Sequence, residues 1–143
     1  MKKVRDWILS AAFFFSSSAF AQEVTSYQDF ASALRAGERF LFVIDMQECT
    51  GNAGMPLGYF SPNKLLLMTE KGENSERIVT SDLHFTNYPG NAIYEYTKYT
   101  FKSDDTISIR TVVYDPVSFK PIGKDYEIHA KLNQGIKVYT QRD

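Results

Sequence analysis

The chain has 143 residues with 16 Lys and Arg against 17 Asp and Glu, a formal net charge of −1, and this balance gives no electrostatic basis for nucleic-acid binding. Its 43% hydrophobic content is enough for a core, and its length suits a single domain. The single cysteine, Cys49, excludes an internal disulfide.

Residues 1–21 have the three parts of a secretory signal peptide: a basic start, an apolar centre over 7–15 and an Ala-x-Ala cleavage site at 19–21. The apolar run is shorter than the roughly 20 residues that a membrane-spanning helix needs. We therefore expect a domain over residues 22–143, starting at Gln22, in the periplasm or secreted, with no membrane span after cleavage.

A short amphipathic helix is expected next, followed by a buried strand. Ser26 and Asp29 have the spacing of a capping box, and Gly37 is well placed to end the helix. The apolar residues between them recur at helical spacing and are Tyr27, Phe30, Ala31 and Leu34. The nearly continuous apolar run in 39–46 predicts a strand covered on both faces.

The segment 48–63 is broken by glycines and prolines and is predicted to be a long loop holding apolar side chains, among them Phe60. A strand is expected to resume at residues 65–69.

Residues 77–115 contain three strand-like runs, separated by turn signals at 88–91 and 102–105. In the first run Val79, Leu83 and Phe85 alternate with polar residues, so we expect these three to face the core. The middle run has apolar residues on both sides, as a central strand does. Two further runs, 126–132 and 136–140, predict a final hairpin.

The predicted fold class is therefore α+β and mostly β. It consists of one N-terminal helix packed on a curved antiparallel sheet, or on a small barrel, of about seven strands.

Three residues offer a weak catalytic hypothesis: Cys49 as a thiol nucleophile, His84 as its base and Asp82 as the group that orients the base. Asp82 and His84 share one face of a strand and could be two ligands of a metal ion, but a zinc site needs three or four protein ligands. The remaining His and Cys candidates are His129 and Cys49. The alternative is that Asp82 and His84 are solvent-facing polar residues. No metal or cofactor is expected, and a small thiol-dependent hydrolase is the second choice.

The preferred hypothesis is a non-enzymatic binding module. Tyr94, Tyr96 and Tyr99, with Tyr126 and with Phe60 from the loop, can line an aromatic cleft for a small ligand, a peptide, or an envelope or host protein. The alternative is that these aromatic residues belong to the core. Glu95 lies among the tyrosines and has no identifiable partner carboxylate.

Several short motifs resemble one family. They are Phe30-x-x-Ala33-Leu34-x-x-Gly37, Val43-Ile44-Asp45 leading to Cys49-Thr50, Asp82-x-His84-Phe85, Tyr96-x-x-Tyr99 before Ser103-Asp104, and Gly135-Ile136-x-Val138-Tyr139. Together they resemble the small exported VirK family of bacteria. The resemblance implies export and an association with virulence or host interaction, and it brings no activity, cofactor or catalytic residue with it.

Overall fold

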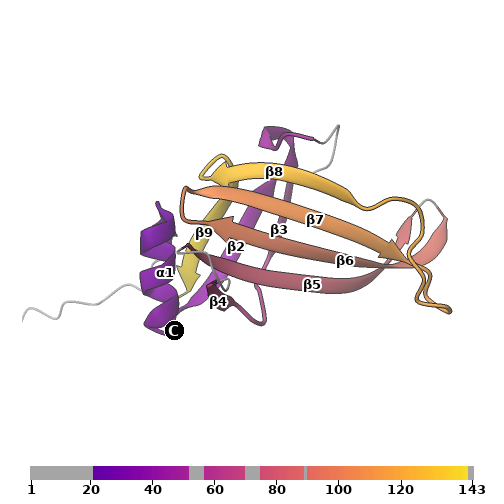
Figure 1. Ribbon diagram of the computed structural model, residues 1–143, viewed down its shortest axis with the longest axis horizontal. Helices are drawn as coiled ribbons and strands as arrows, with labels where there is room; N and C mark the ends of the chain where they lie inside the picture. The colour runs from indigo at the N-terminus through magenta and orange to yellow at the C-terminus, as the bar shows by residue number, and fades with distance from the viewer. Residues whose placement is uncertain (1–20, 52–56, 70–74, 89, 142–143) are drawn as a thin grey trace, which may run out of the picture.

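The computed structural model describes residues 21–51, 57–69, 75–88 and 90–141, which form one nine-stranded sheet and one α-helix (Figure 1). The helix α1 spans Tyr27–Arg35, and a short 3-10 helix, η1, spans Met46–Glu48. The strands are β1 Gln22–Val24, β2 Arg39–Asp45, β3 Leu57–Phe60, β4 Leu66–Thr69, β5 Glu76–Tyr88, β6 Asn91–Lys102, β7 Thr106–Tyr114, β8 Tyr126–Leu132 and β9 Gly135–Gln141. No helix in these residues has the length and hydropathy needed to cross a bilayer.

Helix α1 begins and ends where its sequence signals predict. The Ser26 hydroxyl accepts a hydrogen bond from the Asp29 backbone N–H at 3.1 Å, which satisfies one of the free donors of the first turn. At the other end Gly37 adopts φ +79°, a conformation that glycine reaches without strain. The helix buries Tyr27, Phe30 and Ala31.

The sheet order is β3-β2-β9-β8-β7-β6-β5-β4, with β1 paired to β9, and neighbours are antiparallel apart from a short parallel contact between β8 and β9. The predicted hairpins joining β5 to β6 and β6 to β7 are confirmed, with Gly90 and Asp105 at positive φ in the turns. Pro89 lies outside the described residues. Strand β6 is central, as predicted, and pairs along most of its length on both sides.

The predicted final hairpin is wrong. Strands β8 and β9 are joined by a tight turn, but they share only the parallel pairs Lys131–Gly135 and Leu132–Ile136. Strand β9 then leaves β8 and pairs with β2 from Ile136 to Gln141 (Figure 1). Ile136 and Val138 share the inward face of β9 and are completely buried in the core beside β2.

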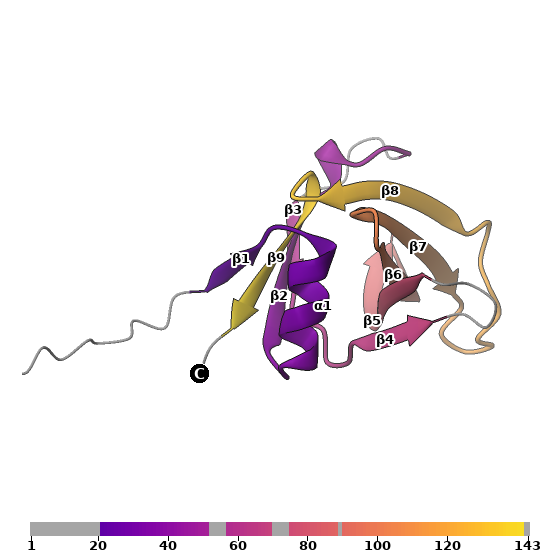
Figure 2. The ribbon, with the colours of Figure 1, turned by 60° about the vertical axis from the view of Figure 1, so that its left-hand side comes forward.

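The corner and the twist of the long strands curl the sheet into a half-barrel that α1 covers at one end (Figure 2). Phe30 of α1 lies at the centre of the core, with its ring edge-on to Phe40, Phe42 and Phe101 at centroid distances of 4.8, 5.9 and 5.1 Å. The predicted class, mostly β with one helix on a curved sheet, is confirmed. Two strands were missed, because β1 has only three residues and β3 forms inside the predicted loop, where it pairs with β2.

Candidate functional site

The face of β5 that was expected to be buried is exposed over its second half. Leu83 and Phe85 are 57% and 59% exposed, whereas Ile78 and Thr80 on the opposite face are 0% and 3% exposed. The pairing explains this, since Ile78 and Thr80 lie beside Phe101 and Tyr99, which belong to the core. The prediction of burial is confirmed for Val79, which is 9% exposed, and is wrong for Leu83 and Phe85.

Asp82 and His84 therefore lie on the core face of β5, beyond the end of the apolar core. The Nδ1 atom of His84 is 3.0 Å from Oδ2 of Asp82, and its Nε2 atom is 4.0 Å from Oε2 of Glu95 on the neighbouring strand. All three side chains keep access to water. Within the described part of the chain, no group of three or more His, Cys, Asp or Glu side chains has a geometry that could hold a metal ion.

Next to Asp82, His84 and Glu95, the residues on the core face of the sheet are buried from water. The hydroxyls of Thr97 and Thr111 form a buried hydrogen bond of 3.0 Å between β6 and β7. Burial, reinforced by the charges of Asp82 and Glu95, raises the pKa of the neighbouring Tyr99 hydroxyl. Tyr99 is therefore a neutral core residue with its hydroxyl near the carboxylates.

The structure does not bring Cys49 to His84. Cys49 is 7% exposed, its thiol donates to the Asp45 carbonyl at 3.3 Å, and its sulfur faces Gly135 of β9. His84 is on β5, and β8, β7 and β6 lie between β9 and β5, a path of roughly 20 Å along the sheet. Burial, followed by the charges of Asp45 and Glu48, raises the pKa of the thiol and so disfavours the reactive thiolate.

The aromatic residues expected to line one cleft are divided between two faces. Tyr94 and Tyr96 point outward from β6, while Tyr99 points into the core, where its ring stacks on Phe60 at 4.8 Å. A period of two separates even from odd positions on a strand, so these side chains cannot meet in one groove. Tyr126 is opposite Thr111 and faces the core with Tyr99.

On the outside of the sheet, seven residues form a continuous patch that we call the outer aromatic surface. Its members are Leu83, Phe85, Tyr94, Tyr96, Val112, Tyr114 and Phe119. The ring of Tyr94 connects the patch, edge-on to Phe85 at 5.2 Å and stacked on Phe119 at 5.5 Å. The patch lies over the ends of β5, β6 and β7 that extend away from α1 (Figure 1).

Phe119 belongs to the loop after β7 and was not predicted as part of any site. The carboxylate of Asp115 fixes this loop by accepting hydrogen bonds from the backbone N–H groups of Val117 and Ser118 and from the Ser118 hydroxyl. The bonds from Ser118 are the main reason why the pKa of Asp115 is lowered. The signal in the sequence was Asp115 followed by Ser118, a spacing typical of such turns.

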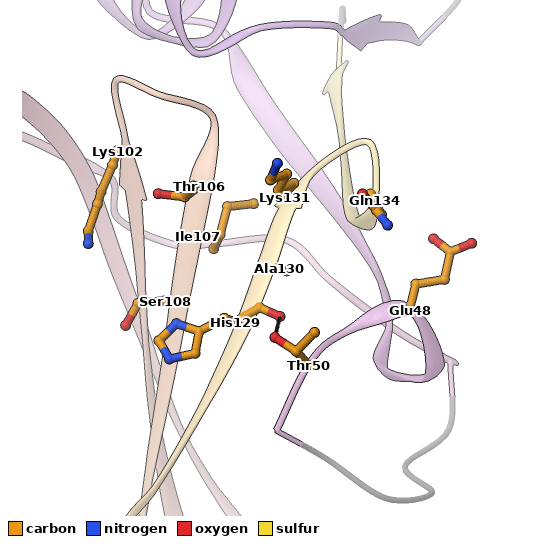
Figure 3. A pocket seen from close by; sticks show the side chains of 10 residues that line it. All are labelled: Glu48, Thr50, Lys102, Thr106, Ile107, Ser108, His129, Ala130, Lys131 and Gln134. Carbon is orange, nitrogen blue, oxygen red and sulfur yellow. Dashed lines mark hydrogen bonds between the residues drawn. The ribbon is translucent and has the colours of Figure 1, made fainter.

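A second surface feature is a groove of about 510 Å³ on the outer side of β7 and β8, shown in Figure 3. Most of its lining residues are polar or charged, among them Lys102, Lys131 and Glu48, and Ile107 and Ala130 are the apolar ones. Its edge is formed where Thr50 and His129 exchange backbone hydrogen bonds of 2.8 and 3.0 Å.

Comparison with known proteins identifies the family. The family model for the VirK protein matches residues 23–119. The structure is similar to the crystal structure of lpg1832, a VirK family protein from Legionella pneumophila, with a TM-score of 0.71 and 30% identity over 81% of this chain and 97% of that chain. The comparison with curated proteins gives no match. The chain therefore belongs to the VirK family.

Proposed function

We propose that this VirK family member is an exported, non-enzymatic binding module that holds a protein partner against its outer aromatic surface. The observation that carries the proposal is the exposure of Leu83, Phe85 and Phe119 in one contiguous patch. Covering large exposed apolar side chains with a partner removes them from water, which lowers the free energy of the system. Contiguous patches of such side chains therefore mark interaction sites.

The edge of β5 beside this surface supports the same proposal. Strand β4 pairs only with Glu76–Val79, so residues 81–88 of β5 have β6 on one side and no strand from the described residues on the other. An unpaired edge can accept an extended segment through backbone hydrogen bonds, and Leu83 and Phe85 would contact its apolar side chains.

Export agrees with the position of the first described strand. Strand β1 starts at Gln22, the residue that follows the predicted cleavage site, and pairs with β9. Cleavage there would leave the described domain intact. The family likeness adds the expected association with virulence or host interaction.

Mass spectrometry of the protein from a periplasmic fraction tests the export step. We expect a chain that begins at Gln22. An uncleaved chain confined to the cytoplasm would exclude a periplasmic or secreted binding role.

Photo-crosslinking in the producing cells tests the binding surface. A photoreactive amino acid at Phe85 or Tyr96 should give one defined adduct, and the same amino acid at Tyr59 or Lys137, exposed positions outside the surface, should not give it. Phe85→Ser combined with the reactive group at Tyr96 should abolish the adduct. Equal adduct formation at all four positions would contradict a defined surface.

A further inference from the structure

The groove on β7 and β8 combines long basic side chains at its sides with short polar ones at its floor. Thr106 and Ser108 of β7 pair with Lys131 and His129 of β8 on the outer face, because Ile107 and Ala130, which lie between them, are buried in the core. Lys102 lies at the end of β6 on the other side of β7. Two strand spacings separate Lys102 from Lys131, about 10 Å, so their ammonium groups can reach one ligand from two sides.

Carboxylates lie on several sides of the groove: Glu48 in its lining, and Asp104 and Glu127 against the hydroxyls of Thr106 and Ser108. No ion pair joins Lys102 or Lys131 to an acidic side chain within the residues that the structure describes. Asp104, whose pKa is lowered mainly by hydrogen bonds from Thr106, also interacts with the charge of Lys102. Glu48 is the one acidic side chain of the lining, and it accepts a hydrogen bond from the Gly135 N–H at 3.1 Å. Figure 3 shows Glu48 on the opposite side of β8 from Lys102. The position left for a negative ligand group is therefore between Lys102 and Lys131, on the side of the groove away from Glu48.

The hydroxyl groups of the floor have a different role. Thr106 donates its proton to Asp104 at 2.6 Å, and Ser108 donates its proton to Glu127. Both oxygen atoms therefore turn lone pairs toward the groove and accept hydrogen bonds from a ligand. The Gln134 amide and the His129 ring add further polar contacts on either side.

We propose that this groove binds a polyhydroxylated anion, that is, a sugar unit carrying a carboxylate or a phosphate. The anionic group lies between the ammonium groups of Lys102 and Lys131, and the ligand hydroxyls donate to Thr106 and Ser108. The volume of about 510 Å³ is within the range of roughly 300–1,000 Å³ typical of small-molecule sites. The site shares no residue with the outer aromatic surface and does not depend on the proposed partner.

NMR titration of the ¹⁵N-labelled protein tests this assignment with four probes: glucuronate, glucose 6-phosphate, glucose and inorganic phosphate. We expect glucuronate, glucose 6-phosphate or both to shift the amide signals of Thr106, Ser108 and His129 in a saturable way, and comparison of the two identifies the preferred anionic group. Glucose, which lacks the charge, and inorganic phosphate, which lacks the hydroxyls, should bind at least tenfold more weakly.

A matched pair of double variants separates the site from general electrostatics. Lys102→Gln with Lys131→Gln should weaken binding of the sugar anion at least tenfold. Lys98→Gln with Lys137→Gln removes the same charge from exposed positions outside the groove and should leave binding unchanged. Three results would overturn the proposal: no saturable shift with either sugar anion, equal weakening in both double variants, or phosphate binding as tightly as the sugar anions.

Discussion

The ring of Phe60 on β3 stacks on the ring of Tyr99 on β6, with centroids 4.8 Å apart and 29° between the ring planes. Four strands, β2, β9, β8 and β7, separate β3 from β6 in the sheet. The two rings meet only because the sheet curls back on itself. Phe60 also packs edge-on against Phe42 of β2 at 5.0 Å, so it connects β2 with β6 across the inside of the half-barrel.

Replacing Phe60 with alanine should therefore destabilise the whole domain. We expect Phe60→Ala to lower the free energy of unfolding by about 2–4 kcal/mol, since a large ring leaves a cavity between β3 and β6. The neighbouring Tyr59 is 80% exposed, and Tyr59→Ala should change the free energy by no more than about 0.5 kcal/mol. Urea denaturation of both variants measures the difference, and equal stability would show that the stack does not hold the curl.

Cys49 and Gly135 should behave as a coupled pair. A Cβ atom on Gly135 would lie 2.8 Å from the Cys49 sulfur and 3.1 Å from the Ala130 Cβ, on a backbone with φ +91°. We expect Gly135→Ala to cost about 2 kcal/mol or more, from both the overlap and the positive φ.

Cys49→Ala removes the sulfur and should relieve part of that overlap. We expect the double variant to be more stable than the sum of the two single changes predicts, by about 0.5 kcal/mol or more. Additive free energies in urea denaturation would show that the sulfur and Gly135 are not in contact.

The buried hydroxyl of Tyr99 predicts a loss of stability in alkali. Its pKa is raised above the ordinary value of 10.0, mainly by burial, so the folded protein keeps this proton to a higher pH than the unfolded chain. The stabilising contribution is complete below the unfolded pKa and is lost as the pH rises towards the folded one.

Tyr99→Phe keeps the ring and removes the titration, so its thermal stability should fall less between pH 8 and pH 10.5 than that of the wild type. Part of the loss should remain in the variant, because burial also raises the pKa of Tyr27. Tyr59→Phe, at an exposed position, is the matched control and should follow the wild type. The same pH dependence for Tyr99→Phe and the wild type would contradict a buried neutral hydroxyl.

Local signals in the sequence predicted the helix and the two hairpins that contain β6, because each depends on residues close together in the chain. Ser26 caps α1 and Gly37 ends it, and Gly90 and Asp105 make the turns on either side of β6. The corner between β8 and β9 could not be predicted in this way. It depends on the pairing of β9 with β2, which places Ile136 beside Ile44 in the core. These two residues are far apart in the chain.

The outer aromatic surface could not be predicted from the sequence, because its residues have the same alternating apolar pattern as core residues of a strand. Leu83 and Phe85 alternate with polar residues as core residues do, and alternation defines two faces without saying which of them is covered. Thr80 and Tyr99 face the core, so Leu83 and Phe85 on the opposite side of β5 are exposed. Phe119 joins the surface through a loop whose fold depends on Asp115, and no strand pattern marks it.

The central claim is that a partner binds the outer aromatic surface, and the affinity of the crosslinked partner for purified variants tests it most directly. By isothermal titration calorimetry, Phe85→Ser and Phe119→Ser should each weaken binding at least tenfold, as expected for aromatic residues at the centre of an interface. Tyr59→Ser, which removes an exposed ring elsewhere, should bind as the wild type does. Unchanged affinity in both Phe85→Ser and Phe119→Ser would contradict the account.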